Sequence, residues 1–138
     1  MKYSFKNKNI VISGSTGGLG AELATELAGL GANLFLFGRD KIKLNSLLIK
    51  LNSNLSSNQI IEIICLDFSL KNIEEKIKLS FSKLPPIDIL INNAAIHGPI
   101  GNFWENDFLF WKNAFQVNFY CPFILTSLAI PSMILNNK

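Results

Sequence analysis

The sequence predicts a doubly wound α/β fold, with a parallel β-sheet between two layers of helices. Three observations indicate this class. Short apolar runs alternate with segments of helical period along the whole chain. One of the runs, Leu34-Phe35-Leu36-Phe37, is continuously apolar, which is typical of a strand buried on both faces of a parallel sheet. A glycine-rich loop separates the first apolar run from the first helical segment.

The first strand is predicted at residues 9–12, directly before the glycine loop. The helix after the loop has leucines at spacings of four, four and three residues, and Gly29 and Gly31 end it. The leucines of this predicted apolar face are Leu19, Leu23, Leu27 and Leu30. The second strand, residues 34–37, follows.

Asp40 is suited to cap the next helix, because a carboxylate at this position accepts from the first backbone amides. Its apolar positions are Leu44, Leu47, Leu48 and Leu51. A polar loop at 52–58 leads to a third strand at 60–66, and a third helix ends before Pro85-Pro86. The apolar positions of that helix are Ile73, Ile77 and Phe81.

A fourth strand is predicted at 87–91, and a long aromatic helix at about 107–134 follows a loop that contains Gly98 and Gly101. Strands that alternate with helices of this length pair in parallel through right-handed crossovers. The strand order 3-2-1-4 is the natural solution, so we expect a Rossmann-like, three-layer αβα domain. No internal linker divides residues 1–138, which form one predicted domain.

Composition excludes several classes of protein. The net charge of +3 comes with no basic face, so we expect no nucleic-acid partner. The two cysteines, Cys65 and Cys121, show no metal-ligand pattern and favour a reducing, cytoplasmic setting. The first residues of the chain are polar and lack the apolar core of a signal peptide. The apolar stretch 119–135 is interrupted by Pro122 and Pro131, which favours a buried helix over a membrane span.

The glycine loop carries the main functional signal, because Gly14, Gly18 and Gly20 have the spacing G-x-x-x-G-x-G between a strand and a helix. Such glycines allow a tight turn, close approach of the backbone to phosphate, and close helix–strand packing. The helix N-terminus offers free amides and partial positive charge to an anion. The predicted pyrophosphate-binding residues are Ser13, Gly14, Ser15, Thr16, Gly17, Gly18, Leu19 and Gly20. The alternative is an ordinary turn; a Walker loop is excluded because no Lys-Ser/Thr pair follows Gly20.

Arg39 follows the second strand, where a dinucleotide fold places either an acid for the ribose hydroxyl or an arginine for a 2′-phosphate. It is the only arginine among thirteen lysines and arginines. A guanidinium can donate two parallel hydrogen bonds to a phosphate, so NADP(H) is favoured over NAD. A surface arginine without a ligand is the alternative, and Asp40 leaves room for NAD.

A series of motifs, in the same order, resembles those of the short-chain dehydrogenase/reductase family along almost the whole chain. The glycine loop resembles T-G-x-x-x-G-x-G, with Ser13 in place of Thr. Leu66-Asp67 is similar to the family's aspartate after strand three, which hydrogen-bonds adenine. Asn92-Asn93-Ala94-Ala95 resembles N-N-A-G with Ala95 in place of Gly, and Val117-Asn118 resembles the Val-Asn pair of the fourth major helix. Pro131-Ser132-Met133 is similar to the Pro-x-Met at the end of that helix.

The resemblance implies a set of site residues. Asp67, Phe68, Asn93, Ala94 and Ala95 are expected to contact the cofactor together with the glycine loop and Arg39.

Asn118 is expected to belong to the family's catalytic tetrad. Pro122 supports this on physical grounds, because proline has no N–H and the carbonyl of residue 118, four positions earlier, loses its helical partner. The alternative is a kinked buried helix in which Asn118 is a satisfied core amide.

The family's Ser and Tyr-x-x-x-Lys are missing, since neither Tyr3 nor Tyr120 is followed by lysine four places on. We therefore expect an NADP(H)-dependent oxidoreductase of small carbonyl or alcohol substrates whose C-terminal half is missing here, and a chain inactive alone. In the full-length form we expect a homo-oligomer and no membrane partner. His97 and Trp104 could border the substrate. The alternative is a catalytically silent nucleotide-binding or interaction module.

Overall fold

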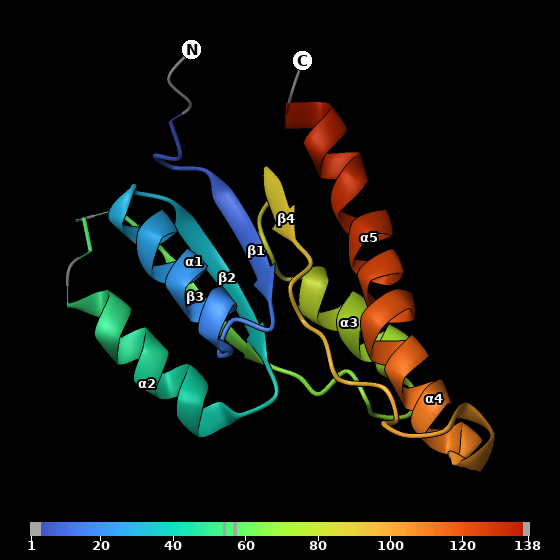
Figure 1. The fold of residues 1–138 in the computed structure, drawn as a ribbon. Helices are drawn as coiled ribbons and strands as arrows, with labels where there is room; N and C mark the ends of the chain where they lie inside the picture. Colours follow the sequence, from blue (N-terminus) through green and yellow to red (C-terminus); the bar gives the residue numbers. More distant parts are fainter. Residues whose placement is uncertain (1–3, 54, 57, 137–138) are drawn as a thin grey trace.

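The computed structural model describes residues 4–53, 55–56 and 58–136, so Tyr3 lies outside it. Four parallel strands form one sheet in the predicted order β3-β2-β1-β4 (Figure 1). The strands are β1 (Asn9–Ser13), β2 (Asn33–Gly38), β3 (Ile61–Cys65) and β4 (Ile89–Ile91). The helices are α1 (Gly18–Gly29), α2 (Lys41–Asn52), α3 (Ile73–Phe81), α4 (Phe108–Phe115) and α5 (Cys121–Asn136).

Two hydrophobic cores lie on opposite faces of the sheet, because alternate side chains of a strand point to opposite sides. Ile10 and Ile12 of β1 face α1 and α2, whereas Val11 faces α3 and α5. Figure 1 shows the same division, with α1 and α2 on one side of the sheet and α3 and α5 on the other. The predicted three-layer αβα arrangement is therefore confirmed.

The third and fourth strands are shorter than predicted. β3 covers 61–65 rather than 60–66, and β4 covers 89–91 rather than 87–91. Before β4, the amide of Ile87 donates to Ser132 Oγ at 3.0 Å, so this residue bonds to α5 instead of a neighbouring strand. Among the described residues β4 pairs only with β1, and its three residues are half-buried at the edge of the sheet.

The predicted leucine stripe of α1 is only partly right. Leu27 is buried, but Leu19 and Leu30 are exposed, and the helix buries Ala24 and Ala28 against the sheet instead. Small alanine side chains let α1 approach the strands closely, and this rotates two of the leucines outward. In α2 and α3 the predicted apolar positions are buried, apart from a half-buried Leu48.

The predicted long helix at 107–134 is present as a helical segment over Phe108–Asn136, but its middle is not α-helical. A π turn, η2 (Gln116–Tyr120), separates α4 from α5, and a short 3-10 turn, η1 (Phe103–Glu105), precedes α4. The amide of Cys121 donates to the carbonyl of Gln116, five residues back, directly before Pro122. Because Pro122 has no amide hydrogen, regular helical bonding ends at this point.

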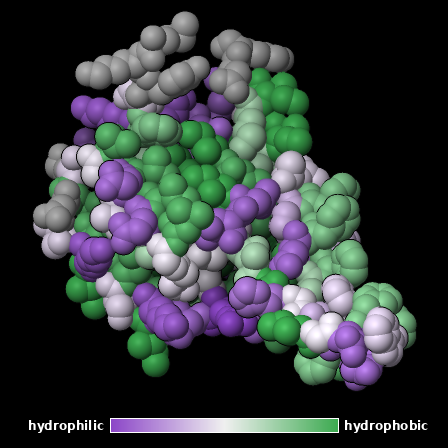
Figure 2. Space-filling model, viewed as in Figure 1, coloured by the Kyte–Doolittle hydropathy of each residue, from purple (hydrophilic) through white to green (hydrophobic). Residues whose placement is uncertain are grey.

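Burial of this helical segment is less complete than predicted. α5 buries Cys121, Ile124, Leu125 and Ala129, while its other side and α4 are apolar and exposed. Figure 2 shows this apolar surface over the α4 and α5 end of the molecule. By length and composition alone, the stretch Phe108–Asn136 could cross a membrane. The absence of a membrane partner stays a prediction.

A polar clamp joins the start of β1 to the residue before β4. The carboxylate of Asp88 accepts from the amide of Asn9 at 2.9 Å and from Lys8 Nζ at 3.0 Å. Partial burial by itself would raise the pKa of Asp88, but the Asn9 amide and the Lys8 ammonium together hold it below the usual value of 3.8. The charged carboxylate is therefore the form that stabilises the fold.

We predict that Asp88→Asn lowers the free energy of unfolding at pH 7 by about 1–2 kcal/mol, because charge-assisted hydrogen bonds are lost. Since the folded pKa lies below the unfolded one, the stabilisation is fully present above the unfolded pKa of 3.8 and disappears as pH falls through the folded pKa. Urea unfolding at neutral and strongly acidic pH measures this. Glu62→Gln, an exposed strand carboxylate, is the control and should change little. An equal loss at both pH values would contradict the role of the charge.

Candidate cofactor-binding site

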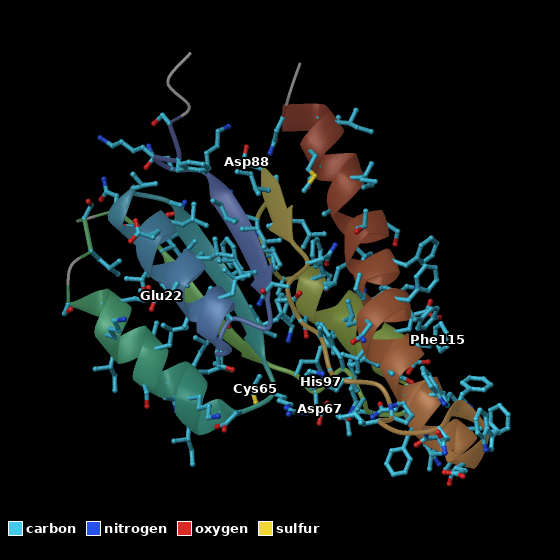
Figure 3. All side chains as sticks on the ribbon, viewed as in Figure 1. Glu22, Cys65, Asp67, Asp88, His97 and Phe115 are labelled. Carbon is cyan, nitrogen blue, oxygen red and sulfur yellow. The ribbon has the colours of Figure 1, made fainter. Side chains whose placement is uncertain are left out.

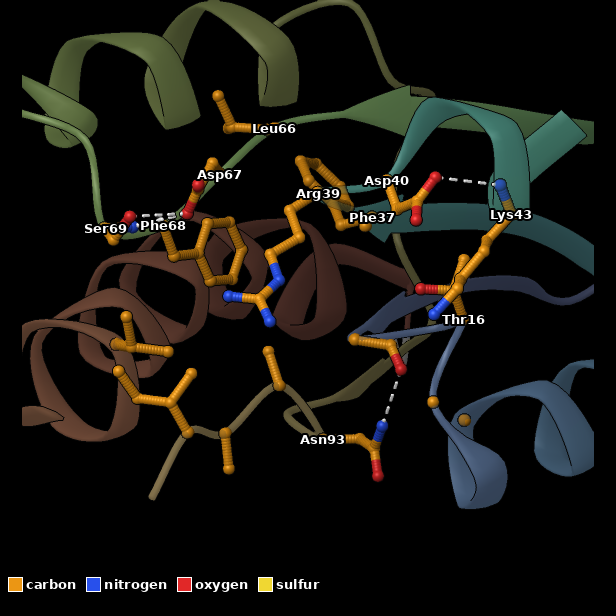
Figure 4. A pocket seen from close by; sticks show the side chains of 18 of the residues that line it. Thr16, Phe37, Arg39, Asp40, Lys43, Leu66, Asp67, Phe68, Ser69 and Asn93 are labelled. Carbon is orange, nitrogen blue, oxygen red and sulfur yellow. Dashed lines mark hydrogen bonds between the residues drawn. The ribbon is translucent and has the colours of Figure 1, made fainter. Parts of the chain in front are cut away.

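An open cavity of about 480 Å³ lies at the carboxyl ends of the strands, where the sheet order reverses between β1 and β4. Open α/β sheets bind their ligands at this position. Every predicted cofactor residue except Ser13 and Ser15 lines it (Figure 4). These are Gly14, Thr16, Gly17, Gly18, Leu19, Gly20, Arg39, Asp67, Phe68, Asn93, Ala94 and Ala95. Motifs from four separate parts of the sequence therefore meet at one cavity.

The three motif glycines have different physical roles. Gly14 has φ +64°, and a Cβ there would lie 2.7 Å from the Cα of Ala94. A Cβ on Gly20 would collide with the carbonyl of Gly14. A Cβ on Gly18 would meet nothing within 4 Å, although this residue lines the cavity. Packing therefore requires glycine at 14 and 20, whereas glycine at 18 leaves open space on the cavity side.

Ser13 and Ser15 are buried behind the loop and build it. Ser13 Oγ accepts from the amides of Asn93 at 3.0 Å and Ala94 at 3.1 Å, and donates to the carbonyl of Ile91 at 3.4 Å. Ser15 donates to the carbonyl of Phe37 through both its amide and its hydroxyl, each at 3.0 Å. The two serines thus attach the loop to the ends of β4 and β2.

Asn93 contacts the same loop through its side chain. Its Nδ2 donates to the carbonyl of Ser13 at 3.2 Å and to that of Gly14 at 3.0 Å. The side chain therefore fixes the glycine loop against the end of β4, while Asn93 itself lines the cavity (Figure 4).

The N-terminus of α1 is prepared for an anion. Gly17 stands at the N-cap position and provides no side-chain cap, so no side chain neutralises the first-turn amides. Helix N-termini carry partial positive charge and unpaired N–H groups, and both favour phosphate. Gly17, Gly18 and Leu19 all line the cavity. The geometry fits a phosphate-bearing ligand.

The charged side chains of the cavity reinforce this preference. Asp40 caps α2, accepting from the amides of Ile42 and Lys43 at 3.0 Å each. Asp67 Oδ1 accepts from both the amide and the hydroxyl of Ser69. Arg39 and Lys43 form no ion pair within the described part of the chain. Figure 4 shows the guanidinium of Arg39 pointing into the cavity.

Asn118 lies outside the cavity lining, in the π turn η2. Its Oδ1 accepts from the amide of Ile96 at 2.9 Å, and its Nδ2 donates to the carbonyl of Ile96 at 2.8 Å. Ile96 lines the cavity in the loop after β4. Asn118 is exposed, so it is no buried core amide, and its side chain fixes this loop. The predicted free carbonyl of Asn118 stays a prediction.

Some lining residues were not anticipated from the sequence: Lys43, Ser69, Ile96 and Asn113. The sequence could have indicated Lys43, because this residue lies in the first turn of the helix that Asp40 caps, close to Arg39. Asn113 had no such signal. His97 and Trp104 are exposed and do not line the cavity (Figure 3 labels His97). Among the described residues there is no group of three or more metal-ligating side chains.

Comparison with known proteins agrees with this geometry. The sequence profile of the family described as short chain dehydrogenase matches residues 8–138. The chain is 33% identical over 133 residues to dehydrogenase/reductase SDR family member 7B of Xenopus laevis, covering 94% of this chain and 41% of that protein. It therefore spans less than half the length of that relative.

Two solved structures share the fold. A short-chain dehydrogenase/reductase of Brucella melitensis, described as a glucose/ribitol dehydrogenase, superposes with a TM-score of 0.78 at 29% identity, over 96% of this chain and 53% of that one. A metagenomic short-chain oxidoreductase solved with NADP superposes with a TM-score of 0.83 at 24% identity, over 99% and 61%.

We predict that Gly14→Ala lowers the free energy of unfolding by about 1–3 kcal/mol, because alanine is strained at positive φ and its Cβ meets the backbone of Ala94. Gly29→Ala is the matched control: a Cβ there meets nothing, and alanine in the last turn of α1 should leave stability unchanged or raise it slightly. Thermal unfolding of both variants measures the difference. Equal stabilities would show that the close contact with Ala94 does not constrain residue 14.

Proposed function

Since this chain belongs to the short-chain dehydrogenase family of oxidoreductases, we propose that its cavity holds NADP(H) for hydride transfer between nicotinamide and a small carbonyl or alcohol substrate. One observation carries the cofactor proposal: the uncapped N-terminus of α1 lines the same cavity as Arg39, which forms no ion pair in the described part of the chain. Both features favour a ligand that bears more than one phosphate group.

The glycine loop is the part of the cavity suited to the pyrophosphate. Gly18 leaves open space there, and the first-turn amides of α1 are free of a side-chain cap. Asp67 and Phe68, in the loop after β3, are proposed to contact the adenine. Asn93, Ala94 and Ala95 line the other wall, at the end of β4.

Arg39 is proposed to bind the 2′-phosphate that distinguishes NADP from NAD, with Lys43 as a second cation beside it. The nearby carboxylate of Asp40 accepts from two amides of α2 through Oδ1, which fits its role as the cap of that helix. The metagenomic neighbour solved with NADP shares the fold. The choice of NADP for this chain rests on Arg39.

A bound nicotinamide supplies the centre that gives or accepts hydride. The described residues hold and orient the cofactor, and Asn118 holds the loop after β4 through Ile96. The sequence contains no Tyr-x-x-x-Lys to exchange the proton of the substrate oxygen. We therefore propose that residues 1–138 form the cofactor-binding part of a longer reductase, which acts in a reducing cytoplasm as a homo-oligomer.

We predict that Arg39→Ala weakens NADPH binding about 10- to 100-fold, because charge-assisted hydrogen bonds to a phosphate are lost. Binding of NADH, which lacks the 2′-phosphate, should stay unchanged. Titration calorimetry or quenching of protein fluorescence measures both affinities. Lys76→Ala is the control, since it removes an exposed cation from α3 away from the cavity. A similar loss for both cofactors would refute the assignment of Arg39.

We also predict that the 138-residue chain binds NADPH without oxidising it when aldehydes or ketones are added. The near-ultraviolet absorbance of NADPH follows this reaction, with a full-length reductase of the same family as positive control. Turnover above the buffer blank would contradict the need for a proton donor outside this chain. The coding sequence after codon 138 tests the alternative of a catalytically silent module. An in-frame Tyr-x-x-x-Lys there would exclude it.

A further inference from the structure

Gln116, the first residue of the π turn η2, reaches from the helix layer to the loop after β3. Its Nε2 donates to the carbonyl of Phe68 at 2.6 Å and to the carbonyl of Leu70 at 3.0 Å. A side-chain amide has two N–H donors, and both are used here. The side chain is half-buried, so water competes only partly for these two bonds.

The loop that Gln116 holds forms one wall of the cavity. Asp67, Phe68 and Ser69 all line the cavity and lie next to the two bonded carbonyls. Phe68 is buried, and its ring packs against that of Phe37 with centroids 6.3 Å apart. A displacement of this backbone would therefore move the side chains that face the ligand.

Few other bonds fix this loop. Its start is joined to β2, where the amide of Leu66 donates to the carbonyl of Gly38 at 2.8 Å. Within the loop, Ser69 bonds to the carboxylate of Asp67, which shapes the turn but does not attach it to the rest of the fold. At its far end α3 begins without a side-chain cap, after Asn72 at φ 58°.

The residues after Gln116 hold the surroundings of the same loop. Cys121 Sγ also approaches the carbonyl of Phe68, at 3.7 Å, and Tyr120 donates to Glu74 in the first turn of α3 at 2.5 Å. The two bonds from Gln116 are shorter than the contact of Cys121 Sγ with the same loop. The backbone around Phe68 is thus positioned from η2 and α5 as well as from the sheet.

We propose that Gln116 is a positioning residue for adenine recognition: by fixing the carbonyls of Phe68 and Leu70, it holds Asp67 and Phe68 where they distinguish adenine from other bases. This inference rests on the proposed function. Gln116 does not line the cavity, so it would act only through the loop. Its loss should therefore reduce the preference for adenine, not merely the stability of the fold.

The experiment compares NADPH with its deamino analogue, in which hypoxanthine replaces adenine, on the full 138-residue chain. Gln116→Met keeps the length of the side chain and removes both donors. We expect NADPH affinity to fall about five- to tenfold, as for the loss of one or two net hydrogen bonds, while the analogue changes less than about twofold. The preference for adenine should then approach unity.

Gln59→Met is the matched control. Gln59 Nε2 also donates to two backbone carbonyls, those of Ala28 at 2.8 Å and Ala32 at 2.7 Å, and it does not line the cavity. This variant should lower the thermal stability to a similar degree and leave the adenine preference unchanged. A purely structural role for Gln116 predicts the same behaviour for both variants.

The outcomes separate the two proposals. A wild-type chain that binds neither NADPH nor NADH contradicts the proposed function. Two results would overturn the role of Gln116 alone. In the first, the wild-type chain binds NADPH and Gln116→Met keeps the same preference for adenine. In the second, the wild-type chain binds NADPH and its deamino analogue equally well. If Gln116→Met does not fold, Gln116→Asn replaces it. That amide is one methylene shorter and cannot span both carbonyls, so a partial loss of preference is expected.

Discussion

The contact between the glycine loop and the end of β4 is the constraint on which the rest of the site depends. Gly14 adopts a positive φ, and its Cα lies so close to the backbone of Ala94 that a Cβ at residue 14 would not fit. Asn93 closes the same junction: its amide donates to Ser13 Oγ, and its Nδ2 donates to the carbonyls of Ser13 and Gly14. Because β1 and β4 meet here, the cavity wall at the switch point is formed by packing and hydrogen bonds within the chain.

Much of this could be predicted from the sequence, because its signals are local. The strand order follows from the alternation of strands and helices, which leaves few topologies. The cap at Asp40 follows from a carboxylate before an apolar helical period, and the structure confirms both of its bonds. The site residues came together for a similar reason, since each predicted motif directly follows a strand and parallel strands end at one edge of the sheet.

What the sequence did not reveal depends on long-range packing. Periodicity shows which residues of α1 are apolar, but the small side chains of Ala24 and Ala28 decide which of them face the sheet, so Leu19 and Leu30 turn outward. Pro122 indicated a break in helical bonding, but not that the break would take the form of a π turn over Gln116–Tyr120. Gln116 bonds to a loop 48 residues earlier, and no local pattern signals such a pair.

The phosphate-binding end and the adenine-binding end of the proposed cofactor site therefore depend on different interactions. At the glycine loop and Arg39, attraction for an anion comes from the helix amides and from cations that form no ion pair within the described residues, while Asp40 caps α2 through Oδ1. Such attraction is screened by salt and varies little with small movements. At Asp67 and Phe68, recognition depends on the position of one loop, which the helix layer holds through Gln116. Since hydrogen bonds weaken steeply with misalignment, affinity for phosphate would survive a loosened loop, but discrimination between bases would not.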